Sequence, residues 1–409
     1  MRRRVCTQVV EGARPASQSR SRKLPASAAL LGLFVFAVSV NAMPAALLRA
    51  ADEFEVGIGA MAQATAVQFA GFVVAAIVGG VLSDRLGKKH LLQAACVLLL
   101  VGAIIVSVAP GLRHAFLGAG LMGIGGGALE CLSTTLLSDL FSDRRKFFLN
   151  LSQVVFCTGA VSGPFLMGLV LPVGVSWRYF FGGIAAMGAV LFVLFSVSQI
   201  PRPPHEERIH FDALVRIVRR PALMLSCAAL FGYVLTESAI VIYSNAYLQT
   251  EHQAPERWAI YSLSLFWFSM GIGRFLCALI PERIAYRPVI VGLLFLTTVT
   301  LVLQNWASGW VASLVLFALS GLACSGIWPL IIGMTASVHA GYSGTVLGIT
   351  IAVGALGCVV APTVMNTFFS HLPPVAVYPA ASLPLVFSLV FILWLKPSRQ
   401  RSRTPSVTS

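Results

Sequence analysis

The hydrophobic residues of this chain fall in long runs that contain no charged side chain. One run extends from Val56 to Ser83 and the next from Leu91 to Leu112, without Asp, Glu, Lys or Arg in either. A helix of about 20 apolar residues crosses the hydrocarbon core of a bilayer. The two runs therefore predict a pair of membrane-spanning helices, joined by the short charged segment between them.

The same criterion, applied to the whole chain, predicts an all-α membrane protein with twelve spanning helices. From Pro288 to Leu395 there is no Asp, Glu, Lys or Arg, so turn-forming and polar residues divide this stretch. The predicted spans are residues 25–48, 57–82, 91–110, 115–139, 148–171, 178–199, 222–248, 258–280, 288–304, 310–334, 344–369 and 376–395. An even number of spans places both ends of the chain on one side of the membrane.

The charged segment between the second and third spans has residue types suited to a gate. Glycine lets two helices approach closely and permits a tight turn. Its aspartate can pair with the adjacent arginine or with a basic residue on another helix, and its lysines suit a cytoplasmic loop. The predicted gating residues here are Gly80, Asp84, Arg85, Gly87 and Lys88.

A second copy of this pattern lies 198 positions further along the chain. The matching pairs are Asp84 with Glu282, Arg85 with Arg283, Lys89 with Arg287, Gly123 with Gly321, Gly159 with Gly357 and Pro164 with Pro362. A two-fold repeat in a membrane chain predicts a transporter built from two related halves. Glu282, Arg283 and the intramembrane Arg274 are the predicted gating residues of the second half.

The repeat and the runs together define the expected organisation. It comprises a basic tail at residues 1–24, a six-helix bundle at 25–200, a linker at 201–221, a second six-helix bundle at 222–395 and a tail at 396–409. Within the linker, Phe211, Leu214, Val215 and Val218 follow helical spacing, which favours an amphipathic helix on the membrane surface. A passive linker is the alternative.

Composition and charge agree with this class. Hydrophobic residues make up 57% of the chain and charged residues 11%, against roughly 25% in soluble domains. The 29 Lys and Arg are segregated into loops, which argues against a nucleic-acid-binding surface. The two tails and the loops on their side carry 24 of them, and the loops on the other side carry 4. This bias predicts cytoplasmic termini in a multi-pass protein of the plasma (inner) membrane.

The first span has a second interpretation. Residues Leu30–Val40 could form the core of a signal peptide, with a cleavage site at Val40–Ala42. The uncharged run continues to Leu48, which is long for a signal core, and its removal would leave an odd number of spans. We therefore expect a spanning helix here.

The candidate functional residues are polar side chains within the spans, where polar groups are unfavourable. Only Glu130 and Glu237, of fifteen acidic residues, fall near the middle of a span. An ionisable group there costs roughly 2.5–3.5 kcal/mol or more unless it is paired, protonated or hydrated, so a role in binding or proton transfer is expected. The alternatives are a structural hydrogen bond for Glu130 and a structural pair with Arg274 for Glu237. Other candidate binding residues are Asn41, Gln68, Gln153, Asn245, Tyr243 and Trp328.

The segment Gly80–Lys89 resembles the signature of the major facilitator superfamily. More specifically, Gly123–Glu130, followed by Leu149–Gln153, Phe156, Gly159-Ala160 and Gly163-Pro164, resembles the fucose–proton symporter branch. Ser325–Pro329 is similar to the tenth helix of that branch, and Glu237, Ile240 and Tyr243 to its seventh.

The resemblance implies two six-helix bundles around a central site, with a monosaccharide or related polyol carried together with a proton. It implies that Glu130 is the coupling acid. Three departures matter: the first span has Asn41 where the fucose symporter has an aspartate, Gln153 stands where many members have histidine, and Glu282 replaces aspartate.

The sequence therefore predicts a secondary active transporter of a small polar solute that works by alternating access. Its expected partners are that solute and the lipid bilayer, with no nucleic acid, and the protein is expected to be a monomer. No cofactor or metal is expected, and the coupling ion is a proton or sodium. The alternatives are an exporter of drugs or metabolites and a non-transporting solute receptor. An enzyme is not expected, because no span or loop holds a nucleophile–base pair or a metal cluster.

Overall fold

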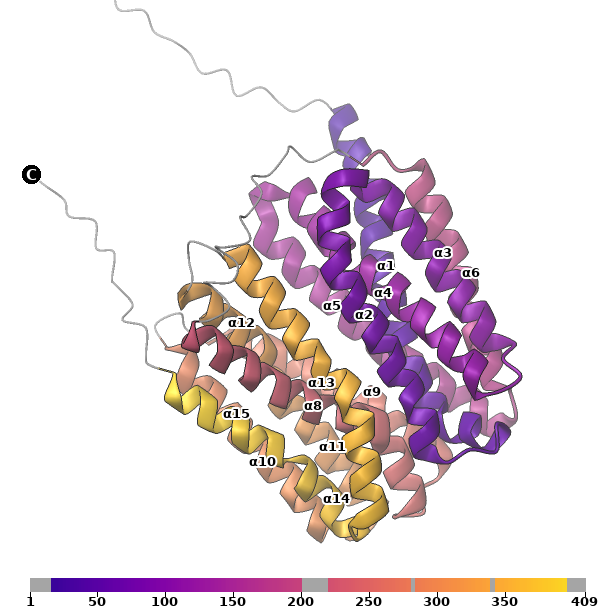
Figure 1. The fold of residues 1–409 in the computed structure, drawn as a ribbon, viewed down its shortest axis with the longest axis vertical. Helices are drawn as coiled ribbons and strands as arrows, with labels where there is room; N and C mark the ends of the chain where they lie inside the picture. The colour runs from indigo at the N-terminus through magenta and orange to yellow at the C-terminus, as the bar shows by residue number, and fades with distance from the viewer. Residues whose placement is uncertain (1–15, 201–219, 281–283, 339–342, 396–409) are drawn as a thin grey trace, which may run out of the picture.

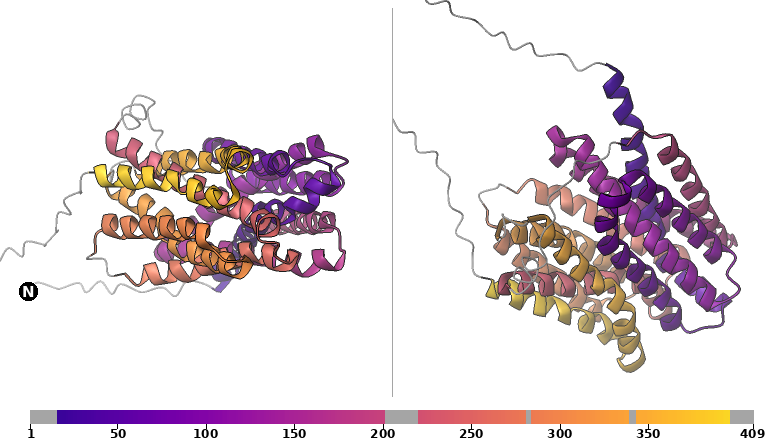
Figure 2. Two further views of the ribbon diagram at one scale, coloured as in Figure 1. Left: turned by 90° about the horizontal axis from the view of Figure 1, so that it is seen from below. Right: turned by 45° about the horizontal axis from the view of Figure 1, so that its top comes forward.

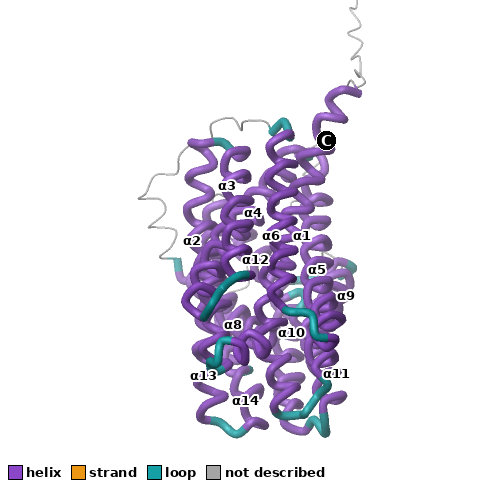
Figure 3. Tube along the Cα trace, turned by 90° about the vertical axis from the view of Figure 1, so that its right-hand side faces the viewer, coloured by secondary structure: helices purple, strands orange, loops and turns teal. Residues whose placement is uncertain are grey.

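The protein is described by a computed structural model that covers residues 16–200, 220–280, 284–338 and 343–395. These residues form helices and the turns that connect them, without a β-strand (Figure 3). The α-helices are α1 (Ala16–Glu53), α2 (Ile58–Leu86), α3 (Lys88–Ser107), α4 (Leu112–Leu140), α5 (Arg145–Val170), α6 (Trp177–Val197), α8 (Pro221–Thr250), α9 (Glu256–Ala278), α10 (Tyr286–Leu303), α11 (Trp310–Cys324), α12 (Ile327–Val338), α13 (Ser343–His371), α14 (Pro374–Ala381) and α15 (Leu383–Trp394). Three short 3₁₀ segments, Ser142–Arg144, Leu171–Val173 and Gln304–Trp306, lie between them.

Twelve segments within the described residues are long and apolar enough to span a membrane, which confirms the predicted fold class. Ten are single helices, and the other two are divided. The span predicted at 310–334 breaks between α11 and α12, and the one at 376–395 breaks between α14 and α15. Prolines explain the breaks, because Pro329 and Pro384 lie in the first turn of the second helix of each pair, where a missing N–H is tolerated.

A single residue connects α2 and α3. Gly87 lies between Leu86, which ends α2, and Lys88, which begins α3, and has a φ of 80°. This conformation is unfavourable for residues with a Cβ atom, so glycine makes the reversal possible. The tight turn predicted at Gly87 is confirmed.

The helices form two bundles that lie side by side (Figure 1 and Figure 2). Helices α1–α6 make up the first half, drawn in indigo to magenta, and α8–α15 make up the second, drawn in rose through orange to yellow. The halves meet chiefly where α2 packs against α13, α5 against α9 and α1 against α8. These six helices therefore determine which side chains face the boundary between the halves.

The internal repeat is visible in the packing. A Cβ atom at Gly123 would overlap the carbonyl oxygen of Gln68, and a Cβ atom at Gly321 would overlap that of Phe266. Gln68 and Phe266 are themselves 198 positions apart. The same close approach therefore joins α4 to α2 in the first half and α11 to α9 in the second, as expected for small residues between membrane helices.

The bundle has two ends, which lie on opposite sides of the membrane. The terminal face is the end at which α1 begins and α15 ends, and the opposite face is the end at which α1 ends and α2 begins. At the terminal face, buried Lys88 pairs with Asp139, which attaches α3 to α4. At the opposite face, Arg178 pairs with Glu53 over 2.7 Å.

Lys88, predicted as a gating residue, thus makes its ion pair within the first half. Glu282 and Arg283 lie outside the described residues, as do the two tails and the linker with its predicted amphipathic helix. The backbone of Gly80, Asp84 and Arg85 belongs to α2, and the surroundings of their side chains lie outside the described part of the structure.

Candidate functional site at the interface between the halves

A buried hydrogen bond crosses between the two halves near the middle of the spans. The indole Nε1 of Trp267, on α9, donates to Oδ1 of Asn41, on α1, over 2.7 Å. The Asn41 side chain also donates through Nδ2 to the carbonyl of Ala37, over 2.9 Å. Asn41 is thus held in one orientation by its own helix and presents its acceptor to the other half.

Aromatic rings surround this bond on the first half. Trp267 meets Phe156 of α5 edge to face, with 5.7 Å between ring centroids. Phe156 in turn contacts Phe36 of α1, which stacks on Phe72 of α2. Such rings exclude water and favour one geometry. They form an aromatic layer contributed by α1, α2 and α5, which meets Trp267 of α9.

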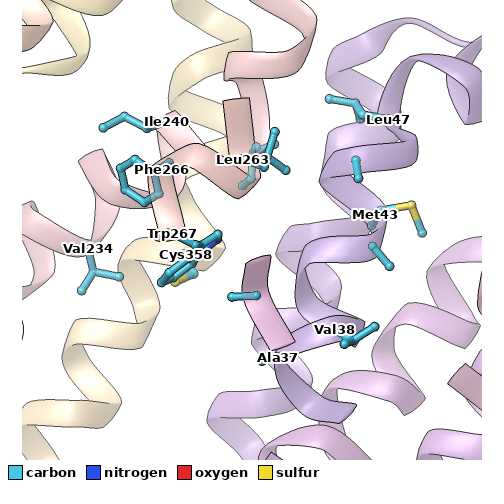
Figure 4. Close-up of a cluster of buried hydrophobic side chains, with 14 of the residues drawn as sticks. Ala37, Val38, Met43, Leu47, Val234, Ile240, Leu263, Phe266, Trp267 and Cys358 are labelled. Carbon is cyan, nitrogen blue, oxygen red and sulfur yellow. The ribbon is translucent and has the colours of Figure 1, made fainter. Parts of the chain in front are cut away.

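Glu130 and Glu237 come from opposite halves, on α4 and α8, and both are partly buried. Both carboxylates lie within electrostatic range of the Cys358 thiol on α13. The hydroxyl of Ser238 donates a hydrogen bond to the sulfur of Cys358 over 3.0 Å. Figure 4 shows Trp267 and Cys358 on the edge of the second half that faces Ala37 and Val38 of α1. Two carboxylates and a thiol therefore share the central region.

The glycines that precede Glu130 serve helix packing. Cβ atoms at Gly125, Gly126 and Gly127 would approach α3, α1 and α2, respectively, to within 3.0 Å. Helix α4 is consequently surrounded by its own half at these positions. These glycines therefore allow α3, α1 and α2 to pack closely against α4.

Arg274 reaches across the interface from α9 to α5. Its Nη1 donates to Oε1 of Gln153 over 3.2 Å and lies 3.4 Å from Sγ of Cys157. Its Nε is buried and has no hydrogen-bond partner. Glu237 interacts with it electrostatically. Among the described residues, however, no carboxylate oxygen lies within the 4.0 Å of an ion pair with Arg274.

Nearer the opposite face, further contacts join the halves. Arg49 at the end of α1 pairs with Glu256 at the start of α9, and Asn245 donates to the carbonyl of Ala45 over 3.2 Å. Gln63 donates to the hydroxyl of Thr363 over 3.3 Å. Asn245 is therefore an interface residue that closes this end, and its amide oxygen is already occupied by Gln249.

Three predicted binding residues lie away from the boundary contacts. Gln68 donates to the carbonyl of Ser39 within the first half. Tyr243 is buried, donates to the carbonyl of Pro362 and stacks on Phe369. Trp328 is partly buried and packs against the hydrophobic core of the second half. The structure thus gives these side chains contacts within one half.

Sequence reasoning missed several residues that the structure brings to the interface. The sequence alone does not single out Arg49, Glu256 or Thr363, and it assigns no functional role to Cys157 or Cys358. What these residues share is that each lies on a helix that faces the other half. A single sequence without spatial information does not show which face that is.

The described residues contain no group of three or more His, Cys, Asp or Glu side chains that could hold a metal ion. The polar groups at the interface are instead amides, carboxylates, a guanidinium and thiols. This set is suited to hydrogen bonding, ion pairing and proton exchange.

The sequence profile described as the Major Facilitator Superfamily matches residues 28–362, which is most of the chain. The chain belongs to the major facilitator superfamily. One curated relative is the MFS-type efflux pump MMF1 of Mycosarcoma maydis, 28% identical over 221 residues. That match covers 52% of this chain and 32% of the relative, so the chain spans about a third of the relative's length.

Two solved structures share the fold of this superfamily member. The crystal structure of the D-xylose-proton symporter has a TM-score of 0.73 and 15% identity, and covers 91% of this chain and 97% of its own. A crystal structure of the fucose:proton symporter of E. coli has a TM-score of 0.65 and 19% identity, and covers 93% and 100%. The predicted major facilitator fold is thereby confirmed.

Proposed function

We propose that the protein is a secondary active transporter that carries a small polar solute of monosaccharide size by alternating access, with a proton bound at Glu130. The observation that supports this most directly is that Glu130 and Glu237, partly buried acids from opposite halves, both lie within electrostatic range of the Cys358 thiol. When the halves rock, an acid in the central region can be exposed to each side of the membrane in turn. The two structural neighbours are a D-xylose-proton symporter and a fucose:proton symporter, which favours a sugar-like solute.

The test of coupling is the substitution Glu130→Gln. The amide keeps the size and hydrogen-bonding capacity of a protonated carboxyl group. The variant should bind solute and exchange it across the membrane, because no proton needs to leave. It should fail to concentrate solute, because the proton gradient no longer drives transport.

The measurement compares counterflow with pH-driven uptake in the same proteoliposomes. Glu237→Gln is the matched comparison, since that acid lies in the other half. Wild-type accumulation by Glu130→Gln would refute its coupling role, and loss of accumulation in Glu237→Gln alone would move that role to Glu237. Replacing the pH gradient with a sodium gradient separates the two candidate coupling ions.

A second function is export of drugs or metabolites. The observation that favours it is the similarity to the MFS-type efflux pump MMF1, 28% identical over 221 residues. Mid-membrane carboxylates serve that activity as well. Cells that lack the protein should then accumulate more of the exported compound, whereas cells that lack an uptake system should accumulate less of its solute.

A further inference from the structure

We infer that the transported solute is a small hydroxylated carboxylate, such as a sugar acid, and that Arg274 binds its carboxylate group. This inference rests on the proposed transport function and names the substrate class. Its basis is the relation between the Arg274 guanidinium, the loosely packed backbone at Gly271 and the polar side chains of α5.

Arg274 is the only Lys or Arg that the sequence places within a predicted span other than at its first residue. A permanent cation within a membrane is unfavourable unless it is paired, and its presence indicates a functional partner. Packing does not require the charge, because the equivalent position in the first half, 198 residues earlier, is Ala76. The charge therefore belongs to one half only, as expected for a group that recognises a solute.

The contacts of Arg274 leave one edge of the guanidinium unused. Nη1 is engaged with Gln153 and Cys157, both neutral. Nε is buried without a partner, and Nη2, on the same side of the planar group, makes no hydrogen bond with the described residues. Two parallel N–H groups on one edge match the two oxygens of a carboxylate. Glu237 affects this charge from beyond ion-pair distance, so it leaves that edge available.

The neighbouring backbone leaves space for a solute. Gly271 lies one turn before Arg274 on α9, and a Cβ atom there would have only Cys157 Cβ nearby, at 4.0 Å. Trp267, one turn earlier still, is buried and packs edge to face on Phe156 of α5. Gln153 is exposed, although it lies within a span. An exposed amide beside a guanidinium suits a molecule that has hydroxyl groups as well as a carboxylate.

The experiment uses the full chain in proteoliposomes with a matched pair of labelled solutes, galacturonate and galactose. They differ in the carboxylate that Arg274 is proposed to bind. Thermal stabilisation of the purified protein is measured in parallel with gluconate, glucuronate, lactate, xylose and fucose, since a ligand that binds the folded state raises its melting temperature. We expect stabilisation by at least one acid, and galacturonate uptake about tenfold or more above that of galactose.

Substitutions then assign the effect to the site. Arg274→Gln should reduce binding and uptake of the acid about tenfold or more, because a charged hydrogen-bonding partner is lost. Arg274→Lys keeps the charge without the planar edge and should retain part of the activity. Arg257→Gln, an exposed position on the same helix, should leave uptake unchanged.

Gly271 provides a test that does not remove a charge. Gly271→Ala fits the packing and should be tolerated, whereas Gly271→Leu should fill the space beside Arg274 and abolish uptake of the acid in a folded protein. Size-exclusion chromatography confirms folding of each variant. Three results would overturn the carboxylate inference and leave the transport proposal standing. They are equal stabilisation and uptake for neutral sugars and acids, undiminished uptake of the acid by Arg274→Gln, and absence of stabilisation by any acid.

The transport proposal itself would be contradicted if no solute were exchanged in counterflow.

Discussion

Arg49 and Glu256 form a two-point ion pair that ties the end of α1 to the start of α9. Nε lies 2.7 Å from Oε1 and Nη2 lies 2.8 Å from Oε2, so the guanidinium and carboxylate meet edge to edge. The two residues belong to different halves and are 207 positions apart in the chain. Their pairing holds the halves together at the opposite face.

Glu256→Gln should weaken this closure. The pair is partly exposed, with 51% and 20% of the two side chains accessible, and exposed pairs contribute about 0–1 kcal/mol. We therefore expect a shift of up to about fivefold toward larger separations at this face. Spin labels at His114 and Ser308, both exposed there, report the distance between the halves. The exchange of charges in Arg49→Glu with Glu256→Arg should restore the original distribution, and an unchanged distribution in Glu256→Gln would contradict the closing role.

Gly123→Ala should destabilise the protein. The added methyl group would overlap the Gln68 carbonyl, which belongs to the backbone of α2 and cannot rotate away. Overpacking of this kind costs about 1–3 kcal/mol. Gly183→Ala is the control, because a Cβ atom there meets nothing within 4 Å, and it should be neutral or slightly stabilising. Thermal unfolding followed by size-exclusion chromatography measures both, and equal melting temperatures would argue against the close approach of α2 and α4.

His252 predicts an acid sensitivity of the fold. Burial of its ring in the turn after α8 lowers its pKa, while the Glu251 carboxylate acts in the opposite direction. Because the folded state holds this proton less tightly than the unfolded state does, stability is present above the unfolded pKa of about 6.5 and is lost as the pH falls below it. The buried Nε2, which has no partner, explains the preference for a neutral ring.

The measurement is the decrease in melting temperature between pH 7.5 and pH 5.5. It should be smaller in His252→Gln than in the wild type. The control is His114→Gln, at an exposed histidine, which should behave as the wild type does. If His252→Gln keeps the full acid sensitivity, other groups account for it.

The orientation in the membrane is testable by thiol labelling. The excess of positive charge in the loops of the terminal face predicts that this face lies in the cytoplasm. In a background without the native cysteines, Ser308→Cys should react with an impermeant maleimide in intact cells. Arg144→Cys, exposed at the terminal face, should react only after permeabilisation. Reversed labelling would invert the topology.

The sequence by itself determined the spans, the turn at Gly87 and the two-fold repeat. Each follows from a property that is local or periodic along the chain: the length of an apolar run, the need for a positive φ, and the recurrence of Gly123 at Gly321. A segment that crosses the lipid must satisfy its own backbone hydrogen bonds. An apolar run long enough to cross the bilayer therefore forms a helix.

Only the tertiary structure decided which polar residues meet. Asn41 binds Trp267 and Gln153 binds Arg274 across more than a hundred residues of chain, while Tyr243 is occupied within its own half. A membrane helix is apolar on nearly every side, because both lipid and neighbouring helices accept the same residues. Hydrophobic periodicity therefore does not reveal which face of α1, α5 or α9 lies against the other half, and that face determines the site.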